Sequence, residues 1–256
     1  MLILLTNDDG VYAPGLAAAY HELTKLGEVH VVAPETVQSA TGHGITVSTP
    51  LLTQRVVVGE GAGRFEGIAV DGRPADCVKL AAAKLLPRPP DLVVSGINSG
   101  ANVGINVLYS GTVAAAIEAA FLGLPAIAVS LHLHPDFPTD YARASTFAVE
   151  TIGMILDAGL RPGEVANINV PAVGPDQRPR GTRVVRQCTR PFADDYDRRT
   201  DPRGREYFWN SSVFALGNGE EDTDVAAIRD KYISVTPLQF DLTQHEKARR
   251  WRERTW

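Results

Sequence analysis

Short apolar runs alternate with stretches of helical periodicity along the first hundred residues. The first run, residues 2–5, has no polar position and is too short for a helix, which is typical of a strand buried on both faces of a parallel sheet. Apolar residues at helical spacing predict a helix over residues 14–26, with Pro14 in its first turn and Gly27 closing it. Residues 28–33 then predict a second strand.

The same alternation continues up to about residue 95. Residues 51–58 and 64–70 flank three glycines and predict a hairpin. A helix is predicted over residues 75–86, and a further buried strand over residues 91–95. Between the second strand and the hairpin, residues 36–44 have the small and polar composition of a loop. This order of elements predicts an α/β protein whose parallel sheet is covered on both faces.

The second half of the chain changes character. Its pattern predicts an amphipathic helix over residues 142–160 and a strand over residues 164–170. After residue 181, strand-like and turn-rich pieces alternate, and the charged stretch 194–205 precedes three aromatic residues at 207–209. The charged stretch alone is equally typical of a solvated surface. Residues 244–256 predict a basic helix whose two tryptophans favour docking against protein.

Two adjacent carboxylates, Asp8 and Asp9, follow the first strand directly. Ligands of parallel sheets bind at the carboxyl ends of the strands, so this pair lies where chemistry is expected. Two negative charges at the edge of a low-dielectric core repel each other and lose hydration, and a hard divalent cation relieves both costs. The alternative is that the Asp-Gly sequence is simply a turn.

The segment after the strand at 91–95 indicates an anion site. Glycines at 96, 100 and 104 allow backbone amides to approach a ligand closely. Ser110, Gly111 and Thr112 begin an alanine-rich helix that reaches about residue 122, and unpaired N–H groups at such a start favour a phosphate. The alternative is an ordinary capped helix. Cation and anion sites side by side predict metal-assisted phosphate chemistry.

Composition narrows the class of protein. With 256 residues and 44% hydrophobic positions, the chain can form one large domain or one domain with an appendage. No apolar stretch reaches the roughly 20 residues that span a bilayer, and no basic segment precedes the first apolar run, so we expect neither a membrane partner nor a signal peptide. Cytoplasmic residence is the resulting expectation. The net charge of -5 argues against binding duplex nucleic acid.

Four segments together resemble the SurE family (stationary-phase survival protein) of metal-dependent 5'-nucleotidases. They are NDDG at 7–10, QSATGHGIT at 38–46, SGINSGANVG at 95–104 and SGTVAAAIEA at 110–119. Further matches follow in order at 167–171, 201–204, 207–209, 223–224, 234–238 and 241–243. The resemblance implies a three-layer Rossmann-like sandwich with a mostly parallel sheet, a C-terminal extended β arm and a terminal helix. It also implies hydrolysis of nucleoside 5'-monophosphates, with 3'-nucleotides and short polyphosphate as further substrates.

The resemblance implies four metal ligands: Asp8, Asp9, Ser39 and Asn98. All four donate oxygen, which suits one divalent ion per subunit, Mg²⁺ or Mn²⁺. The mechanism that follows is attack of a metal-activated water on the phosphate. One of the two aspartates also orients or deprotonates that water, and the sequence does not decide which.

The remaining site residues are our assignments. Asn102, together with Ser110, Gly111 and Thr112 of the helix start, is assigned to the phosphate. His43 is a candidate acid near the leaving group, although a loop histidine can equally be just solvated. The chain departs from the usual family pattern in the loop around Ser39. Thr36 stands where a basic residue is frequent, and Ala40 stands where a glycine usually follows the serine.

Other interpretations remain open from the sequence. A non-catalytic nucleotide-binding regulator could use the same pocket, whereas a signalling receiver module would need a carboxylate after the strand at 91–95. His132 and His134 could bind a metal from one strand face or belong to a loop entering Pro135. The resemblance further implies a catalytic core over residues 1–180, and a β-hairpin arm and C-terminal helix for oligomerisation over residues 181–256. The arm would exchange between the subunits of a homodimer or homotetramer.

Overall fold

The computed structural model of the protein describes residues 1–59, 61–190, 195–210 and 219–254. Its strands are β1 (Leu2–Thr6), β2 (Glu28–Pro34), β3 (Thr53–Val58), β4 (Phe65–Val70), β5 (Leu92–Ser99), β6 (Ala126–Leu131), β7 (Val165–Val170), β8 (Thr182–Val184), β9 (Tyr196–Thr200), β10 (Glu206–Asn210) and β11 (Ile233–Leu238). Its α-helices are α1 (Pro14–Leu23), α2 (Pro74–Leu80), α3 (Gly111–Phe121), α4 (Tyr141–Asp157), α5 (Asp224–Arg229) and α6 (His245–Arg252). None of these helices is long and apolar enough to cross a membrane.

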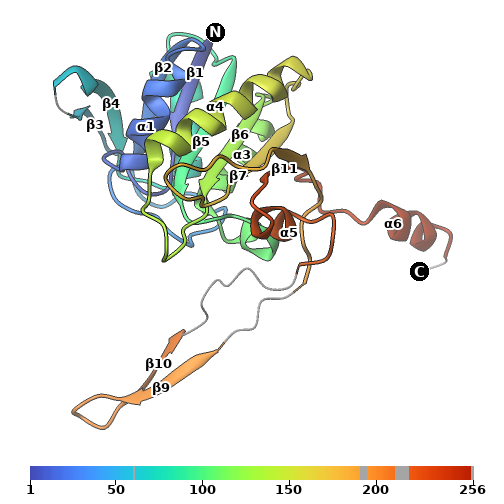
Figure 1. Cartoon of the computed structure of the whole chain (residues 1–256). Helices are drawn as coiled ribbons and strands as arrows, with labels where there is room; N and C mark the ends of the chain where they lie inside the picture. The colour runs from blue at the N-terminus through green and yellow to red at the C-terminus, as the bar shows by residue number, and fades with distance from the viewer. Residues whose placement is uncertain (60, 191–194, 211–218, 255–256) are drawn as a thin grey trace.

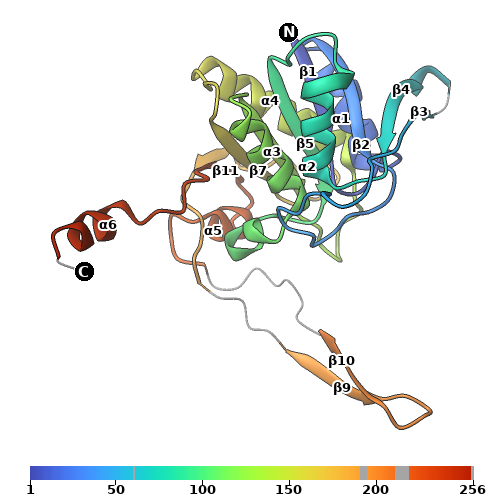
Figure 2. The same cartoon turned by 180° about the vertical axis from the view of Figure 1, so that it is seen from behind.

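Nine strands form one sheet in the order β3-β4-β2-β1-β5-β6-β7-β11-β8. The six strands from β4 to β7 pair in parallel, while β3 and β11 run antiparallel to their inner neighbours β4 and β7. Helices α1 and α4 cover one face of the sheet, and α2 and α3 cover the other (Figures 1 and 2). The expected three-layer α/β sandwich is therefore confirmed.

Strand β1 shows why the core takes this form. Its five residues are all buried, and their side chains alternate between the two helical layers. Ile3 and Leu5 pack in the cluster that contains Leu16 of α1, whereas Leu4 packs in the cluster that contains Val113 of α3. A strand with apolar side chains on both faces is stable only between two layers of helices, as the first apolar run predicted.

The order in which successive strands are added to the sheet reverses between the neighbouring parallel strands β1 and β5. From β1 the chain proceeds through β2 to β4 on one side, and from β5 it proceeds through β6 to β7 on the other. Ligands of open α/β sheets bind in the crevice at this switch point, beyond the carboxyl ends of the strands. Asp8 follows β1, and Asn98 lies at the end of β5, so both residues border that crevice.

Several boundaries differ from the sequence predictions. The helix predicted over 75–86 is split into α2 and a π-helical turn, Ala81–Leu85. The strand predicted to end at residue 95 continues to Ser99, with an irregular register between Ser95 and Asn98. Strand β6, which begins directly after Pro125, was not predicted. Within the charged stretch, residues 196–200 form the exposed strand β9, which pairs with β10.

Two elements stand apart from the sandwich. The hairpin of β9 and β10 and the terminal helix α6 both project away from the sheet (Figures 1 and 2). All ten hairpin residues are exposed, and α6 buries none of its residues. Asp194 and Trp256, which the predictions included in the arm and helix, lie outside the described residues. The division at residue 180 stays a prediction, and β8 and β11 beyond it complete the central sheet.

Candidate functional site

A cavity of about 220 Å³ opens at the switch point of the sheet. Its lining includes five of the residues singled out in the sequence: Asp8, Ser39, Asn98, Asn102 and Ser110. They come from four separate segments of the chain, so the fold brings together what the sequence keeps up to 102 positions apart. The other predicted residues lie beside this cavity or, for one of them, in a neighbouring cavity.

Asp8 lies against the start of α3. Its side chain is only 4% exposed, and its Oδ1 accepts a hydrogen bond of 2.5 Å from the Thr112 hydroxyl. A Cβ on Gly111 would lie 2.8 Å from the Asp8 Cβ and 3.0 Å from Oδ2. The Asp8 side chain therefore leaves no room for any residue other than glycine at position 111. The positive end of the helix dipole favours a negative charge at this point.

Burial disfavours the charged forms of both aspartates. Desolvation, together with the neighbouring charge of Asp9, raises the pKa of Asp8 from 3.8 to about 6. Burial also raises the pKa of Asp9, although a 2.9 Å hydrogen bond from the Ser99 backbone N–H to its Oδ2 works in the opposite direction. A divalent cation between the two would supply the opposite charge that this pair lacks.

The loop that carries Ser39 is tied to the same strand end. The Gln38 N–H donates to the Asp8 carbonyl at 2.7 Å, and the Gly42 N–H donates to the Tyr109 carbonyl at 3.0 Å. Between these anchors, Ala40 adopts a φ of 55°, in the left-handed region that favours glycine. A glycine would adopt this conformation without strain, whereas the alanine of this chain is strained there.

Replacing Ala40 with glycine should relieve that strain. We expect Ala40→Gly to raise the free energy of unfolding by about 1 kcal/mol, because an L-residue pays roughly that much in the left-handed region. Ala158, the C-cap of α4, is the matched control: its φ of -73° is an ordinary value, so Ala158→Gly should bring no gain in stability. Urea denaturation of both variants measures the difference. Equal losses in the two variants would mean that Ala40 is not strained.

Asn98 presents an oxygen to the cavity. Its Nδ2 donates to the Gly100 carbonyl at 2.6 Å, which leaves Oδ1 as the atom available to a cation. The strand reaches this point only by passing very close to β6: a Cβ on Gly96 would lie 2.2 Å from the Val129 carbonyl oxygen. Gly96 also has a φ of 140°, so glycine is required there on both counts.

The donor set fits a hard divalent cation. The Asp8 carboxylate, the Ser39 hydroxyl and the Asn98 amide border one small space, and Asp9 follows Asp8 directly in the chain. Oxygen ligands are those that Mg²⁺ and Mn²⁺ prefer. Within the described parts of the chain, no group of three or more His, Cys, Asp or Glu side chains gathers to form a more strongly charged metal site. The neutral oxygens of Ser39 and Asn98 would therefore complete any coordination that Asp8 and Asp9 begin.

The start of α3 offers donors to an anion. Ser110 caps the helix, since its Oγ accepts from the Val113 N–H at 3.1 Å, and its own hydroxyl hydrogen remains free to donate. The Thr112 hydroxyl is used by Asp8, so Thr112 and Gly111 can offer only their first-turn N–H groups. Asn102 uses its Nδ2 on Ser130 Oγ at 2.8 Å, which leaves one amide hydrogen for a ligand.

His43 lines a second, largely apolar cavity of about 440 Å³. Its Nε2 lies 2.7 Å from Glu118 Oε2, and its ring stacks on Phe121 with centroids 5.2 Å apart. Phe240 closes the cavity from the chain after β11, and Ser110 lines both this cavity and the one at Asp8. His43 therefore lines a different cavity from Asp8, and Ser110 lines both.

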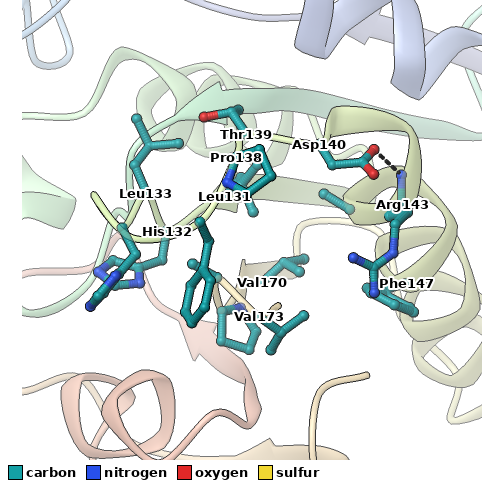
Figure 3. Close-up of a pocket in the computed structure, with 15 residues that line it drawn as sticks. Leu131, His132, Leu133, Pro138, Thr139, Asp140, Arg143, Phe147, Val170 and Val173 are labelled. Carbon is teal, nitrogen blue, oxygen red and sulfur yellow. Dashed lines mark hydrogen bonds between the residues drawn. The ribbon is translucent and has the colours of Figure 1, made fainter. Parts of the chain in front are cut away.

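The paired histidines lie in a third cavity, of about 30 Å³, between the end of β6 and α4 (Figure 3). His132 and His134 follow the last residue of β6, so the loop interpretation is confirmed. Burial, together with the positive charge of Lys231, lowers the pKa of His132 to about 4. Across the cavity, Asp140 caps α4 by accepting from the Arg143 N–H at 3.0 Å (Figure 3). This cavity holds none of the predicted ligands.

Comparison with known proteins agrees with the resemblance. Residues 3–194 match the family described as Survival protein SurE. The chain is 49% identical to a protein of Syntrophobacter fumaroxidans named 5'-nucleotidase SurE, over 96% of both chains, and 47% identical to one of the same name from Carboxydothermus hydrogenoformans, over 96% of this chain and 92% of the relative. The crystal structure of the SurE protein from Aquifex aeolicus superposes with a TM-score of 0.82 at 34% identity, covering 99% of this chain and 100% of the other. The chain belongs to the SurE family.

Proposed function

We propose that the protein is a metal-dependent phosphomonoesterase that hydrolyses nucleoside 5'-monophosphates to nucleoside and phosphate. The observation that carries the proposal is the buried Asp8 carboxylate, which lies against a helix start in a cavity bordered by Ser39 and Asn98. The relatives named 5'-nucleotidase support the same activity. They do not favour the alternative of a non-catalytic nucleotide-binding regulator.

The proposed roles follow from the contacts of each side chain. Asp8, Asp9, Ser39 and Asn98 would hold one Mg²⁺ or Mn²⁺ ion. When bound, such an ion supplies a Lewis acid that polarises the phosphoryl group and makes water a stronger nucleophile at neutral pH. Thr112 fixes the Asp8 carboxylate through its short hydrogen bond, so that the ligand is oriented before the cation arrives.

The protein's own donors stabilise the transferring phosphoryl group. Ser110 and Asn102 line the cavity, and Gly111 and Thr112 follow Ser110 in the first turn of α3. The Ser110 hydroxyl, the amide hydrogen left on Asn102 and the first-turn N–H groups would supply donors to the developing negative charge. Asp9 is the better placed of the two aspartates to take a proton. It is less buried than Asp8, and its hydrogen bond from Ser99 uses Oδ2 and leaves Oδ1 available.

The second cavity is proposed to hold the nucleoside. It adjoins the phosphate donors through Ser110 and is lined mainly by apolar side chains, which suits a base and a sugar face. His43 lines the same cavity and is our candidate to donate a proton to the leaving 5' oxygen. Its hydrogen bond with Glu118 and its stacking on Phe121 hold the ring in place.

Phe121→Ala should weaken nucleotide binding selectively. We expect the KM for AMP to rise about tenfold, since the aromatic surface contacts the base in ground state and transition state alike. The kcat should fall as well, because the His43 ring loses the stacking that holds it. Ribose 5-phosphate, which has no base, should show the fall in kcat with an unchanged KM. The control is Leu122→Ala, because Leu122 is 45% exposed beside Phe121 and is not among the lining residues. Equal effects on both substrates would place the nucleoside elsewhere.

Phosphate release from AMP, with and without Mn²⁺, tests the proposed activity directly. We expect release with Mn²⁺ and none after chelation. A panel of nucleoside monophosphates would show whether 3'-nucleotides and short polyphosphate are also hydrolysed. Binding of all these nucleotides without release of phosphate would support the regulator instead.

We also propose that the protein forms a homodimer or homotetramer through its projecting elements. Tyr196, Tyr207, Phe208 and Trp209 are each 40–59% exposed on the β9–β10 hairpin. Such an aromatic surface on an isolated two-stranded hairpin is typical of an element that packs against a partner. Sedimentation of the full chain would give the number of subunits.

A further inference from the structure

Side-chain amides from β7 enclose the backbone of Asn102. The Asn102 N–H donates to Asn169 Oδ1 at 2.7 Å. Its carbonyl accepts from Asn167 Nδ2 at 2.8 Å and from Asn169 Nδ2 at 3.2 Å. A loop residue thus has both of its backbone polar groups satisfied by the side chains of a strand more than sixty residues away in sequence.

Asn167 and Asn169 are polar side chains in the interior of the protein, where an amide without hydrogen-bond partners lowers stability. Asn167 and Asn169 are fully buried in a strand whose other residues are apolar. Burying an amide costs free energy unless its polar atoms find partners, and three of their four side-chain polar atoms are used on Asn102. The fourth, Asn167 Oδ1, has no partner among the described residues. The strand therefore carries two amides whose contacts all serve one loop.

A second anchor holds the same loop two residues further on. Asp224, at the start of α5, is fully buried. Its Oδ2 accepts from the Gly104 N–H at 2.8 Å, and its Oδ1 accepts from the Cys188 N–H at 2.9 Å. Both anchors lie in segments that the resemblance singled out, at 167–171 and 223–224, and to which the proposed mechanism gives no part.

The anchored loop is bounded by glycines in uncommon conformations. Glycines at 100 and 104 have positive φ values of 121° and 59°, conformations open to few other residues. The loop joins Asn98, a proposed metal ligand, to Asn102, a proposed phosphate donor, so its path sets the separation of the two side chains. Small errors in such separations cost catalysis heavily.

We infer that Asn167, Asn169 and Asp224 are positioning residues of the active site. They fix the path of the loop from Gly100 to Gly104, and through it the places of Asn98 and Asn102, without touching the substrate. The loss of any one should loosen the loop while the sheet stays intact. The inference rests on the proposed function for its effect on catalysis, but not for its effect on the loop.

Hydrogen exchange of the metal-free protein tests the structural half. In Asn169→Leu we expect the amides of residues 99–106 to exchange at least about tenfold faster, while β7 stays within about twofold of the wild type. Ser130→Ala is the milder second variant, because it removes only the side-chain bond of Asn102. Ser234→Ala is the matched control: Ser234 is fully buried, pairs opposite Asn169, and has no hydrogen-bond partner for its hydroxyl in the described structure.

Affinity and kinetics test the functional half. With Mn²⁺ present, we expect the dissociation constant for inorganic phosphate to rise at least about fivefold in Asn169→Leu, and kcat for AMP to fall more than KM rises. Ser234→Ala should leave both unchanged. Faster loop exchange with unchanged phosphate affinity would overturn the inference, as would unchanged loop exchange. Failure of the proposed function would appear separately, as wild-type protein that releases no phosphate from any nucleotide.

Discussion

Asp8→Asn should abolish turnover and yet give a metal-free protein that is more stable than the wild type. The amide keeps the shape of the side chain and can still accept from the Thr112 hydroxyl, so the fold should be retained. It removes a negative charge from the cation site, and we expect kcat to fall by at least about a thousandfold. Phosphate release from AMP with saturating Mn²⁺ measures this loss.

The gain in stability follows from the raised pKa. The Asp8 pKa is about 6 in the folded protein, above its ordinary value of 3.8, so the folded state binds the proton more tightly than the unfolded state. The contribution of Asp8 to stability is therefore largest at low pH and is lost as the pH rises from about 4 through about 6. Asparagine does not titrate, so the variant should gain up to about 3 kcal/mol over metal-free wild type at pH 7 and above.

Asp91→Asn is the control for this first prediction. Asp91 lies directly before β5, at the amino ends of the parallel strands and so at the opposite end from the cavity. There the Arg88 guanidinium and the Leu2 N–H hold the pKa of its carboxyl well below the usual range. Its replacement should leave turnover unchanged and should not stabilise the protein. Metal-dependent turnover in Asp8→Asn would show that the Asp8 charge is not needed to hold the cation. A lower stability than metal-free wild type above pH 7 would show that burying this charge does not destabilise the fold.

Gly111→Ala should reduce kcat/KM for AMP by about a hundredfold, because displacing a reacting group by about 1 Å has an effect of that size. The added methyl would lie 2.8 Å from the Asp8 Cβ, closer than carbon atoms approach without a shift. Either the Asp8 carboxylate or the start of α3 must move. The first is a proposed metal ligand, and the second carries the proposed phosphate donors. Steady-state kinetics with AMP measure the effect.

Gly153→Ala separates this contact from the general effect of removing a glycine. Gly153 lies within α4 and has no atom within 4 Å of the position of an added Cβ. Alanine should stabilise that helix by about 0.5–1 kcal/mol and leave kinetics unchanged. A Gly111→Ala variant with wild-type kinetics would show that the carboxylate does not need its position against the helix.

Much of the catalytic edge could be predicted from local pattern. The apolar run before Asp8 predicted that β1 is buried. Ser110 predicted the start of α3, because serine is a favoured N-cap residue. Residues that end parallel strands must meet at one edge of the sheet, so Asp8 and Asn98 could be brought together without knowing any distance. The departure at Ala40 was visible as a difference of one residue, and its positive φ shows what that difference costs.

The rest depends on contacts between distant segments. No local signal says that the Thr112 hydroxyl turns to Asp8 instead of to phosphate, or that His43 faces a neighbouring cavity. The two asparagines of β7 did carry a signal, since amides inside an apolar strand need partners. Their partner, Asn102, lies 65 and 67 positions away and could be identified only from the folded chain.

The central claim is that Asp8, Asp9, Ser39 and Asn98 hold the cation on which phosphate chemistry depends. A crystal structure of the protein with Mn²⁺ and inorganic phosphate tests it most directly. The account predicts an anomalous peak about 2.0–2.2 Å from oxygens of these four residues, with a phosphate oxygen beside it at the start of α3. A peak at any other place in a preparation that hydrolyses AMP would contradict the account.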